Sequence, residues 1–166
     1  LYVFDRQLRL LLFNAIEKIE IAFRTQLIYS YAIDFGSHWH TNPQLYNNSV
    51  QFANDIASLQ KEIDRSKETF IKHYIEKYTI PKEPPAWMSL EVSSMGLLSK
   101  MFSNLIDNKT KQNIATHFGL KDVDILENWM RCFSLIRNIC AHHGRVWNRR
   151  MTQITLPKKP KYSYIV

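Results

Sequence analysis

The sequence predicts an all-α fold, a bundle of four to five helices. Over long segments the apolar residues recur at three- and four-residue steps, which is the period of an amphipathic helix. Apart from residues 153–156, no segment alternates apolar and polar residues as a half-buried strand does. The 166 residues include only four glycines and six prolines, so few points interrupt the helices.

The first helix is predicted over residues 6–32. Charged residues such as Glu17 and Arg24 form its outer face. Gly36 is predicted to end it, and residues 37–48 to form a connection with one short turn. The apolar positions of the inner face are Leu8, Leu11, Leu12, Ala15, Ile16, Ile19, Ala22, Phe23 and Leu27.

A second helical stretch is predicted over residues 50–78, with a break near Ser66, a residue suited to capping a new helix. Pro81, Pro84 and Pro85 then exclude a helix across residues 79–86. We interpret this proline segment as a crossover between helices rather than a domain boundary. The apolar side of the stretch is formed by Phe52, Ile56, Leu59, Ile63, Phe70, Tyr74 and Ile75.

Three further helices are predicted, over residues 89–105, 108–118 and 122–143. Gly119 is placed to end the second of these. Asp122 and Asp124 suit the start of the last helix, because acidic side chains interact favourably with a helix N-terminus. The last helix is expected to direct inward Val123, Leu126, Trp129, Met130, Phe133, Ile136 and Cys140.

Composition fits one domain over residues 1–166, since 45% of the residues are hydrophobic and 22% are charged. No apolar run approaches the roughly 18 residues that cross a bilayer, so no membrane association is expected. Cys132 and Cys140 lie two turns apart on one predicted helix, too far for a disulfide, so we expect a reducing, cytoplasmic location. The chain begins without Met, and we expect an N-terminal part of the full-length protein to be absent.

The positive charge is concentrated at the end of the chain. Residues 1–130 hold 14 basic and 15 acidic residues, whereas residues 131–166 hold eight basic residues and no acidic one. Such an asymmetry is typical of an anion-binding face. A solvated tail is an equal alternative for Lys158, Lys159 and Lys161.

Candidate chemistry lies at the end of the last helix. Asn138, His142 and Arg145 are spaced four and three residues apart and so share a face on a helix. Arg137 lies beside them, and Arg149 joins by a further step of four if the helix continues through Gly144. Histidine, arginine and an amide supply a proton shuttle, a fixed cation and a positioning dipole, which suits metal-independent phosphoryl transfer. The alternative is structural: Arg137 pairs with an acid elsewhere and His142 is a cation at the helix C-terminus.

The sequence from Arg137 to His142 resembles the Arg-x(4–6)-His signature of the HEPN superfamily of helical ribonucleases and RNA-associated proteins. The longer run at residues 136–149, IRNICAHHGRVWNR, resembles the C-terminal motif of the Abi-like abortive-infection family, the AbiD/AbiF-type phage-resistance proteins. The segments at residues 16–25, 84–92 and 114–120 also resemble this family. The resemblance therefore spans essentially the whole chain.

The resemblance implies a single HEPN-like Abi domain and a role in phage defence. Arg137, Asn138 and His142 match the catalytic motif of a metal-independent endoribonuclease in which the ribose 2′-OH attacks the phosphate. HEPN sites are composite, so one motif per chain implies a homodimer. The expected RNA-binding residues are His143, Arg145, Asn148, Arg149 and Arg150.

No cofactor and no metal are expected, and RNA is the expected partner, with an antitoxin or a guide-like RNA as further candidates. The alternative is a non-catalytic RNA- or protein-binding module of a defence or toxin–antitoxin system, because many HEPN proteins lack nuclease activity. The chain has no Gly-rich phosphate loop, which disfavours an ATP- or GTP-driven enzyme.

Two aromatic-rich patterns are given structural interpretations. His38 and His40 have His-x-His spacing, but no cysteine or carboxylate cluster accompanies them, so we interpret them as part of an exposed loop rather than a metal site. Trp87, Trp129 and Trp147 are interpreted as core or interface anchors. Base stacking stays open for Trp147, which lies among arginines.

Overall fold

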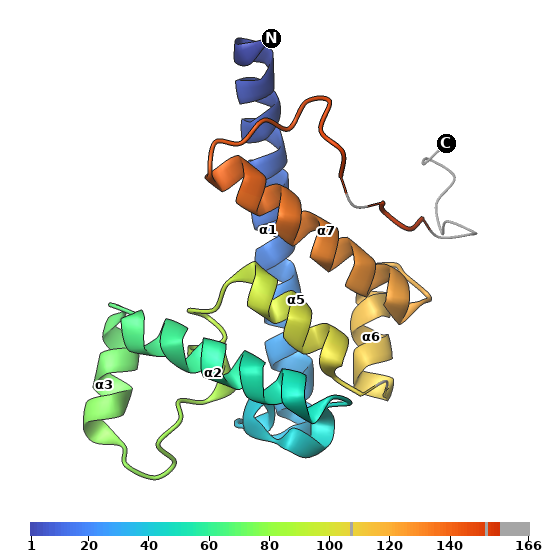
Figure 1. Ribbon diagram of the computed structural model, residues 1–166. Coiled ribbons are helices and arrows are strands. Elements are labelled where there is room, and N and C mark those ends of the chain that lie inside the picture. Colours follow the sequence, from blue (N-terminus) through green and yellow to red (C-terminus); the bar gives the residue numbers. More distant parts are fainter. Residues whose placement is uncertain (107, 152, 157–166) are drawn as a thin grey trace.

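The computed structural model describes residues 1–106, 108–151 and 153–156, and the chain is all-α (Figure 1). The described ranges contain seven α-helices and two 3-10 turns, and no strand. The fold class is therefore confirmed, with more helices than expected. In chain order the elements are α1 (Tyr2–Phe35), η1 (Trp39–Thr41), η2 (Pro43–Leu45), α2 (Ser49–Arg65), α3 (Thr69–Lys77), α4 (Ala86–Ser89), α5 (Met95–Asn104), α6 (Lys109–His117) and α7 (Val123–Ala141).

Helix α1 is the long central helix, and α4, α5, α6 and α7 pack directly against it, whereas α2 packs on α5 and α3 lies farther out (Figure 1). The N-terminal part of α1 extends beyond them and is accompanied by the end of α7 and the chain that follows. As predicted, the helix ends at Gly36, which adopts a positive φ of 86°. Leu11 was expected on the inner face but is 69% exposed, because this part of α1 packs against the end of α7 through Leu8, Leu12 and Phe13 and not through Leu11.

The predicted break near Ser66 is confirmed, since α2 ends at Arg65 and α3 begins at Thr69. Ser66 is the C-cap of α2, and its hydroxyl accepts a hydrogen bond from the Glu68 amide at 3.2 Å. Ile75, expected on the apolar side of this stretch, is exposed. The short helix α3 thus buries a narrower face than its apolar pattern implies.

The helix predicted over residues 89–105 is wrong at its start, where the chain forms α4 and then α5. Serine side chains explain the interruption, because they offer the backbone alternative hydrogen bonds. The Ser93 hydroxyl donates to the Leu90 carbonyl at 2.7 Å. The Ser94 hydroxyl accepts from the Leu97 amide at 3.4 Å and so caps α5.

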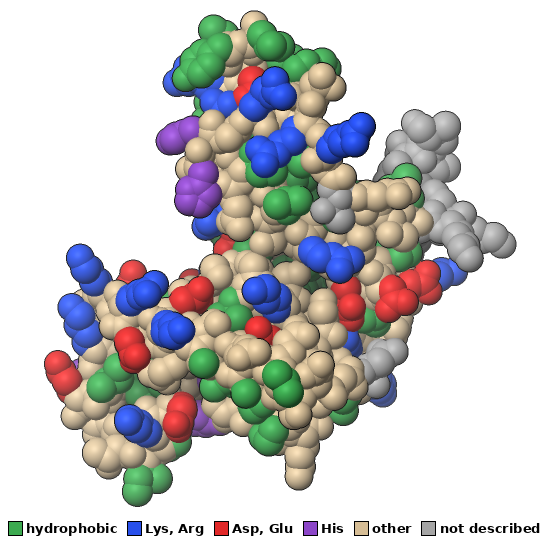
Figure 2. All heavy atoms as spheres, in the orientation of Figure 1, with side chains coloured by type: hydrophobic (Ala, Val, Ile, Leu, Met, Phe, Trp, Pro, Cys, Tyr) green, Lys and Arg blue, Asp and Glu red, His purple; other side chains and the backbone are tan. Residues whose placement is uncertain are grey.

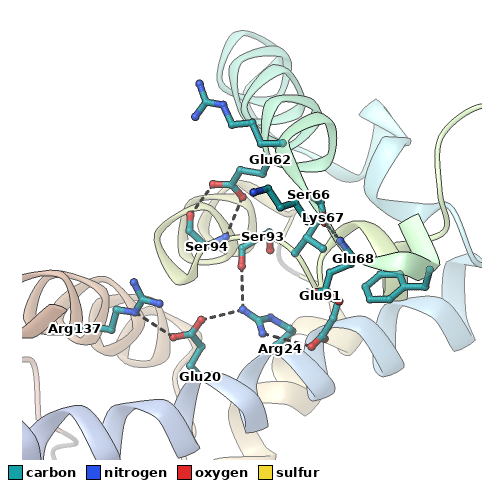
Figure 3. A pocket seen from close by; sticks show the side chains of 13 residues that line it. Glu20, Arg24, Glu62, Ser66, Lys67, Glu68, Glu91, Ser93, Ser94 and Arg137 are labelled. Carbon is teal, nitrogen blue, oxygen red and sulfur yellow. Dashed lines mark hydrogen bonds and ion pairs between the residues drawn. The ribbon is translucent and has the colours of Figure 1, made fainter. Parts of the chain in front are cut away.

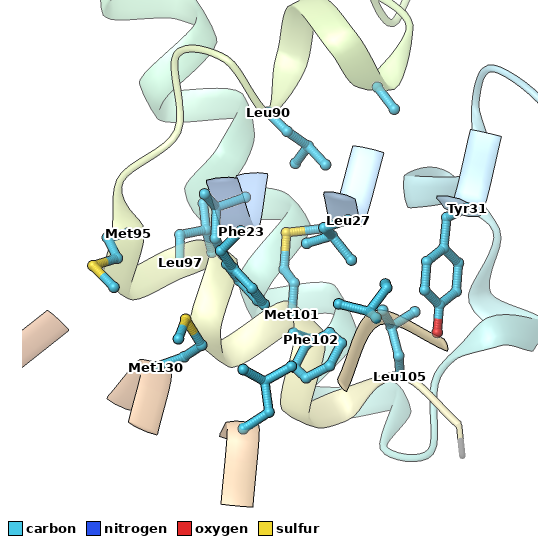
Figure 4. Close-up of a cluster of buried hydrophobic side chains, with 14 of the residues drawn as sticks. Phe23, Leu27, Tyr31, Leu90, Met95, Leu97, Met101, Phe102, Leu105 and Met130 are labelled. Atoms are coloured by element: carbon cyan, nitrogen blue, oxygen red, sulfur yellow. The ribbon is translucent and has the colours of Figure 1, made fainter. Parts of the chain in front are cut away.

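The core lies where α1, α5 and α7 meet (Figure 4). Phe23 and Phe102 are fully buried and pack edge to face, with ring centroids 5.2 Å apart. Burial of such large rings is the main stabilising contribution that holds α1 against α5. Other core residues drawn in Figure 4 are Leu27, Tyr31, Leu90, Met95, Leu97, Met101, Leu105 and Met130.

A buried ion pair connects α6 to α7. The Lys111 ammonium lies 2.7 Å from Glu127 and donates to the Leu105 carbonyl at 2.8 Å. Because a buried ammonium is costly without partners, these contacts satisfy a group that the bundle has enclosed.

Beyond α7 the chain turns back along this helix. Asn128 donates to the Gln153 carbonyl at 3.2 Å and accepts from the Thr155 amide at 2.8 Å. The Trp129 indole donates to the Thr155 carbonyl at 2.7 Å. Residues 153–156 therefore form an extended segment bound to α7 rather than a strand.

Replacing Phe102 by Ala is expected to lower the free energy of unfolding by about 3–5 kcal/mol, because it removes a buried ring and leaves a cavity beside Phe23. Urea denaturation followed by circular dichroism measures the change. The control is Tyr29→Ala, an exposed aromatic residue of α1 whose loss should change stability by about 0.5 kcal/mol or less. Equal stability of the two variants would contradict the assigned core.

Candidate functional site

Helix α7 ends at Ala141, just before the two adjacent histidines. The His143 amide donates to the Cys140 carbonyl at 3.1 Å, and the Gly144 amide donates to the Ile139 carbonyl at 2.8 Å. These bonds terminate the helix in the manner of a Schellman motif. The helix therefore ends close to the predicted residue 143 and does not continue through Gly144, the condition under which Arg149 would join the face of Asn138. The predicted helical spacing of Arg145 from His142 is wrong, because Arg145 lies beyond the helix.

Close packing requires glycine at position 144. A Cβ atom there would lie 3.2 Å from the Ile139 carbonyl oxygen and 3.1 Å from its Cγ2. The left-handed backbone conformation of this turn falls on His143, with φ of 55°, and a second one falls on Asn148, with φ of 54°. The segment after α7 thus has a defined shape. We call residues 142–149 the basic loop.

A single carboxylate near the start of α1 anchors the basic loop. Asp5 Oδ1 accepts hydrogen bonds from the amides of Val146 at 3.0 Å and Trp147 at 2.7 Å, and Oδ2 pairs with Arg9. Asp5 is 5% exposed, and the Phe4 ring packs edge to face on Trp147. These contacts join residues about 140 positions apart in the sequence and hold the loop on α1.

The environment of Asp5 stabilises its ionised form. The hydrogen bond from the Trp147 amide is the main cause of a lowered pKa, and burial opposes it. The Val146 amide and Arg9 lower the pKa further. The carboxylate is therefore charged at neutral pH, and it gives the basic loop a fixed negative partner on α1.

The motif arginine has an acidic partner. Arg137 Nε lies 3.7 Å from Glu20 Oε2 on α1, with the Arg137 side chain 37% exposed (Figure 3). Glu20 also pairs with Arg24 at 2.9 Å, and Arg24 donates to the Ser93 carbonyl at 2.9 Å. The structural alternative raised by the sequence, an acid paired with Arg137, is present in this fold.

This network lines a cleft of about 760 Å³ between α1, the α2–α3 connection and the segment before α5 (Figure 3). Acidic and basic side chains alternate around it, including Glu62, which accepts from both the amide and the hydroxyl of Ser94. Because its charges are already matched, the cleft does not provide the uncompensated positive potential that binds a polyanion.

The predicted catalytic residues are not gathered at one point of a single chain. Arg137 and His142 are five residues apart, which corresponds to about 140° around the axis of α7. Asn138 and His142 are exposed and lie one turn apart, and the His142 amide donates to the Asn138 carbonyl at 3.0 Å. Arg137 instead points toward Glu20.

The predicted RNA-binding residues are brought together on the exposed side of the basic loop and just after it. This set comprises His143, Arg145, Asn148, Arg149 and Arg150, all of them exposed. Figure 2 shows histidine, Lys and Arg side chains together on the lobe formed by the N-terminal part of α1 and the end of α7. Lys158, Lys159 and Lys161 lie outside the described residues.

The interpretation of His38 to His40 as an exposed loop is wrong. Trp39 and His40 are buried in η1, and Trp39 packs on Tyr31 with ring centroids 4.7 Å apart. Burial, with a smaller contribution from His38, lowers the pKa of His40 to about 4, so its ring is neutral. Within the described residues, no group of three His, Cys, Asp or Glu side chains is placed to hold a metal ion.

The three tryptophans lie in different environments. Trp129 binds the returning chain through its indole, as an anchor does, but Trp87 and Trp147 are about half exposed. Trp147 has its backbone fixed by Asp5 and one ring face against Phe4, and the remainder of the ring faces solvent. An interaction with a ligand base is therefore sterically open to it.

Sequence reasoning missed Asp5 and Glu20, the two carboxylates that control the site. Asp5 has one local signal, its (i, i+4) spacing to Arg9. Glu20 has no such signal for Arg137, because the two residues meet only when α1 and α7 cross.

The fold and the site define an all-helical protein that displays a basic, histidine-containing loop at the end of its last helix. The family described as Abi-like protein matches residues 1–148, and the chain belongs to this family. No curated protein and no solved structure gave a significant match. None of the helices in the described ranges has the length and hydropathy required to span a membrane.

Asp5→Asn is expected to reduce the pH dependence of stability. Since the pKa of Asp5 in the folded protein lies below its ordinary value of 3.8, its contribution is complete above that value and is lost as the pH falls through the folded pKa. The difference in unfolding free energy between parent and Asp5→Asn should therefore be constant near pH 6 and shrink below pH 3.8.

Urea denaturation at a series of pH values measures this difference. The control is Asp64→Asn, which removes an exposed carboxylate of α2. A parent and an Asp5→Asn variant that lose stability in parallel on acidification would exclude the anchoring role of Asp5.

Proposed function

We propose that this protein acts in abortive infection, the phage-defence response, as a metal-independent endoribonuclease with a composite Arg/His site across a homodimer. Membership of the Abi-like family supports the defence role. The observation that carries the chemical proposal is the exposed pair Asn138 and His142 at the end of α7, beside a basic loop that Asp5 holds in place.

The proposed reaction uses the nucleophile that RNA already contains. His142 accepts the proton of the ribose 2′-OH, the 2′ oxygen forms a bond to phosphorus, and the bond from phosphorus to the 5′ oxygen breaks. The leaving 5′ oxygen takes up a proton from the second histidine of the composite site. The products are a 2′,3′-cyclic phosphate and a 5′-hydroxyl, and no metal is needed to generate the nucleophile.

The other two motif residues act on the phosphate. Arg137 stabilises the charge that develops on the pentavalent phosphorus, because guanidinium offers a planar pair of donors. Asn138 positions the phosphate or the His142 ring. Arg137 and His142 of one chain point about 140° apart around α7, so they do not readily reach the same phosphate. This supports a site in which the arginine comes from one copy of the chain and the histidine from the other.

A second candidate is a non-catalytic RNA- or protein-binding module, with an antitoxin or a guide-like RNA as its partner. The pairing of Arg137 with Glu20 favours this candidate, because a guanidinium engaged by a carboxylate is a weaker phosphate ligand. The two candidates share the basic loop and differ in whether RNA is cut.

An RNA-cleavage assay distinguishes the nuclease from the binding module. The purified protein is expected to cleave single-stranded RNA at the same rate with and without EDTA, since none of the proposed groups needs a metal. His142→Ala should lower the rate about 100-fold or more by removing the proton shuttle, while RNA binding persists. Arg137→Lys should retain binding better than turnover, because it keeps the charge but loses the planar donors.

Gel analysis of cleavage products measures the rate, and the matched control is His73→Ala, an exposed histidine on α3. Cleavage that survives in His142→Ala, or disappears in EDTA, would overturn the mechanism and leave the binding module.

The composite site makes a separate prediction about assembly. Arg137→Ala and His142→Ala should each be inactive, and mixing the two should restore a small part of the cleavage, because a mixed dimer regains one Arg137 and one of the two His142 side chains and so assists one of the two proton transfers. Light scattering should give the mass of a dimer at micromolar concentration. A monomer, or a mixture that stays inactive, would count against the shared site.

A further inference from the structure

A hollow of about 690 Å³ lies between the N-terminal part of α1 and the end of α7, and we call it the α1–α7 groove. Its α1 wall consists of residues at steps of three and four, which places them on one face of the helix. The groove is lined by Tyr2, Arg6, Leu10 and Phe13 of α1 and by Cys140 and His143 at the end of α7, among others.

The charge of the groove is positive. No carboxylate lines it, and the lining includes two arginines and His143. Of the arginines, Arg9 is buried and paired with Asp5, whose carboxylate also accepts the two amides of the basic loop. Arg6 is exposed and keeps its charge available to a ligand, so the groove is suited to an anion.

The walls of the groove are mostly apolar and include two aromatic rings. Tyr2 and Leu10 are exposed and Phe13 is half-buried. Burial raises the pKa of the Cys140 thiol, so this part of the lining is neutral. Aromatic rings beside a cation form the combination that stacks an unpaired base and pairs with its phosphate.

The groove also adjoins the motif arginine. A second hollow of about 300 Å³, which is lined by Glu20 and Arg137, shares Phe13 with the α1–α7 groove. His143 lines the groove, whereas His142 is not among its lining residues. RNA in the groove would therefore contact His143 directly and would lie next to the hollow that Arg137 lines.

We infer that the α1–α7 groove binds a short unpaired segment of single-stranded RNA, with one base against Tyr2, a neighbouring base against Phe13, and phosphate on Arg6 and His143. This inference rests on the proposed function and specifies its substrate: an RNA strand with an unstacked base next to the scissile phosphate. Duplex RNA, whose bases are stacked and paired, does not fill the groove.

The test compares the binding of two oligonucleotide probes to the protein. One is a single-stranded eight-residue oligouridine with 2′-O-methyl riboses, which lack the nucleophile and so are not cut. The other is the same oligonucleotide with abasic riboses. Fluorescence anisotropy gives the affinity for each. The parent is expected to bind the base-bearing probe about fivefold or more tightly, because each stacked base adds affinity.

Variants of the aromatic wall should remove this preference. Tyr2→Ala and Phe13→Leu should bring the affinity ratio of the two probes close to one, and Tyr29→Ala, an exposed tyrosine elsewhere on α1, should leave it unchanged. Arg6→Ala should weaken both probes alike and flatten the salt dependence by about one unit. Lys18→Ala, an exposed cation of the same helix, should not.

The outcomes distinguish the inference from the proposed function. If Tyr2→Ala and Phe13→Leu still prefer the base-bearing probe, the inference that the groove binds RNA bases is overturned. RNA cleavage by the parent would still support the proposed nuclease. A change of oligomeric mass in these variants, with the preference unchanged, assigns the groove to contacts between copies and also overturns the inference. A parent that neither binds nor cleaves RNA at low salt overturns both.

Discussion

The crossing of α1 and α7 is the constraint on which the candidate site depends. Helix α7 carries the motif residues, but α1 supplies the groups that hold them: Asp5 binds the basic loop and Glu20 binds Arg137. The crossing is itself set by core packing farther along α1, where Phe23 contacts Phe102 and α7 contributes Met130. A change in that core would therefore be transmitted to the loop, because interiors are densely packed and α1 is continuous between the two regions.

The basic loop has an unfavourable backbone conformation at two residues and is held by hydrogen bonds to a buried carboxylate. Two of its residues, His143 and Asn148, adopt left-handed conformations that are unfavourable for residues other than glycine. Two amides directed at one ionised carboxylate offset this cost, since hydrogen bonds to a charged group are stronger than neutral ones. The loop is thus ordered before any ligand arrives, which lowers the entropic cost of binding.

Local sequence patterns predicted the helices, but they did not predict the contacts between residues far apart in the sequence. The apolar period indicated α1, α6 and α7, and the prolines located the crossover. The division of α4 from α5 was missed because Ser93 and Ser94 act through their own hydroxyl groups rather than through the apolar pattern. For the site, the sequence predicted Arg137, Asn138, His142 and the basic residues, and their roles stay predictions. It could not identify Asp5 or Glu20 as their partners, because about 140 and 117 positions separate the contacting residues.

The charged residues along one face of α1 change sign from one end of the candidate site to the other. Glu17 and Glu20 line the same hollow as Arg137, whereas Arg6 and Arg9 line the same groove as His143. The electrostatic potential along the α1–α7 crossing is therefore neutral or negative near Arg137 and positive near His143. A polyanion approaching this surface is repelled at the Glu17 end and attracted at the Arg6 end. Arg137 stands at the boundary, held by Glu20. In the proposed RNA complex, a phosphate near the histidines would compete with Glu20 for the Arg137 guanidinium, and contacts of the strand with the groove and the basic loop would favour the phosphate. If the proposed function holds, the Glu20–Arg137 pair would therefore contribute to selectivity, because it would disfavour isolated phosphates and favour an RNA strand that makes several contacts at once.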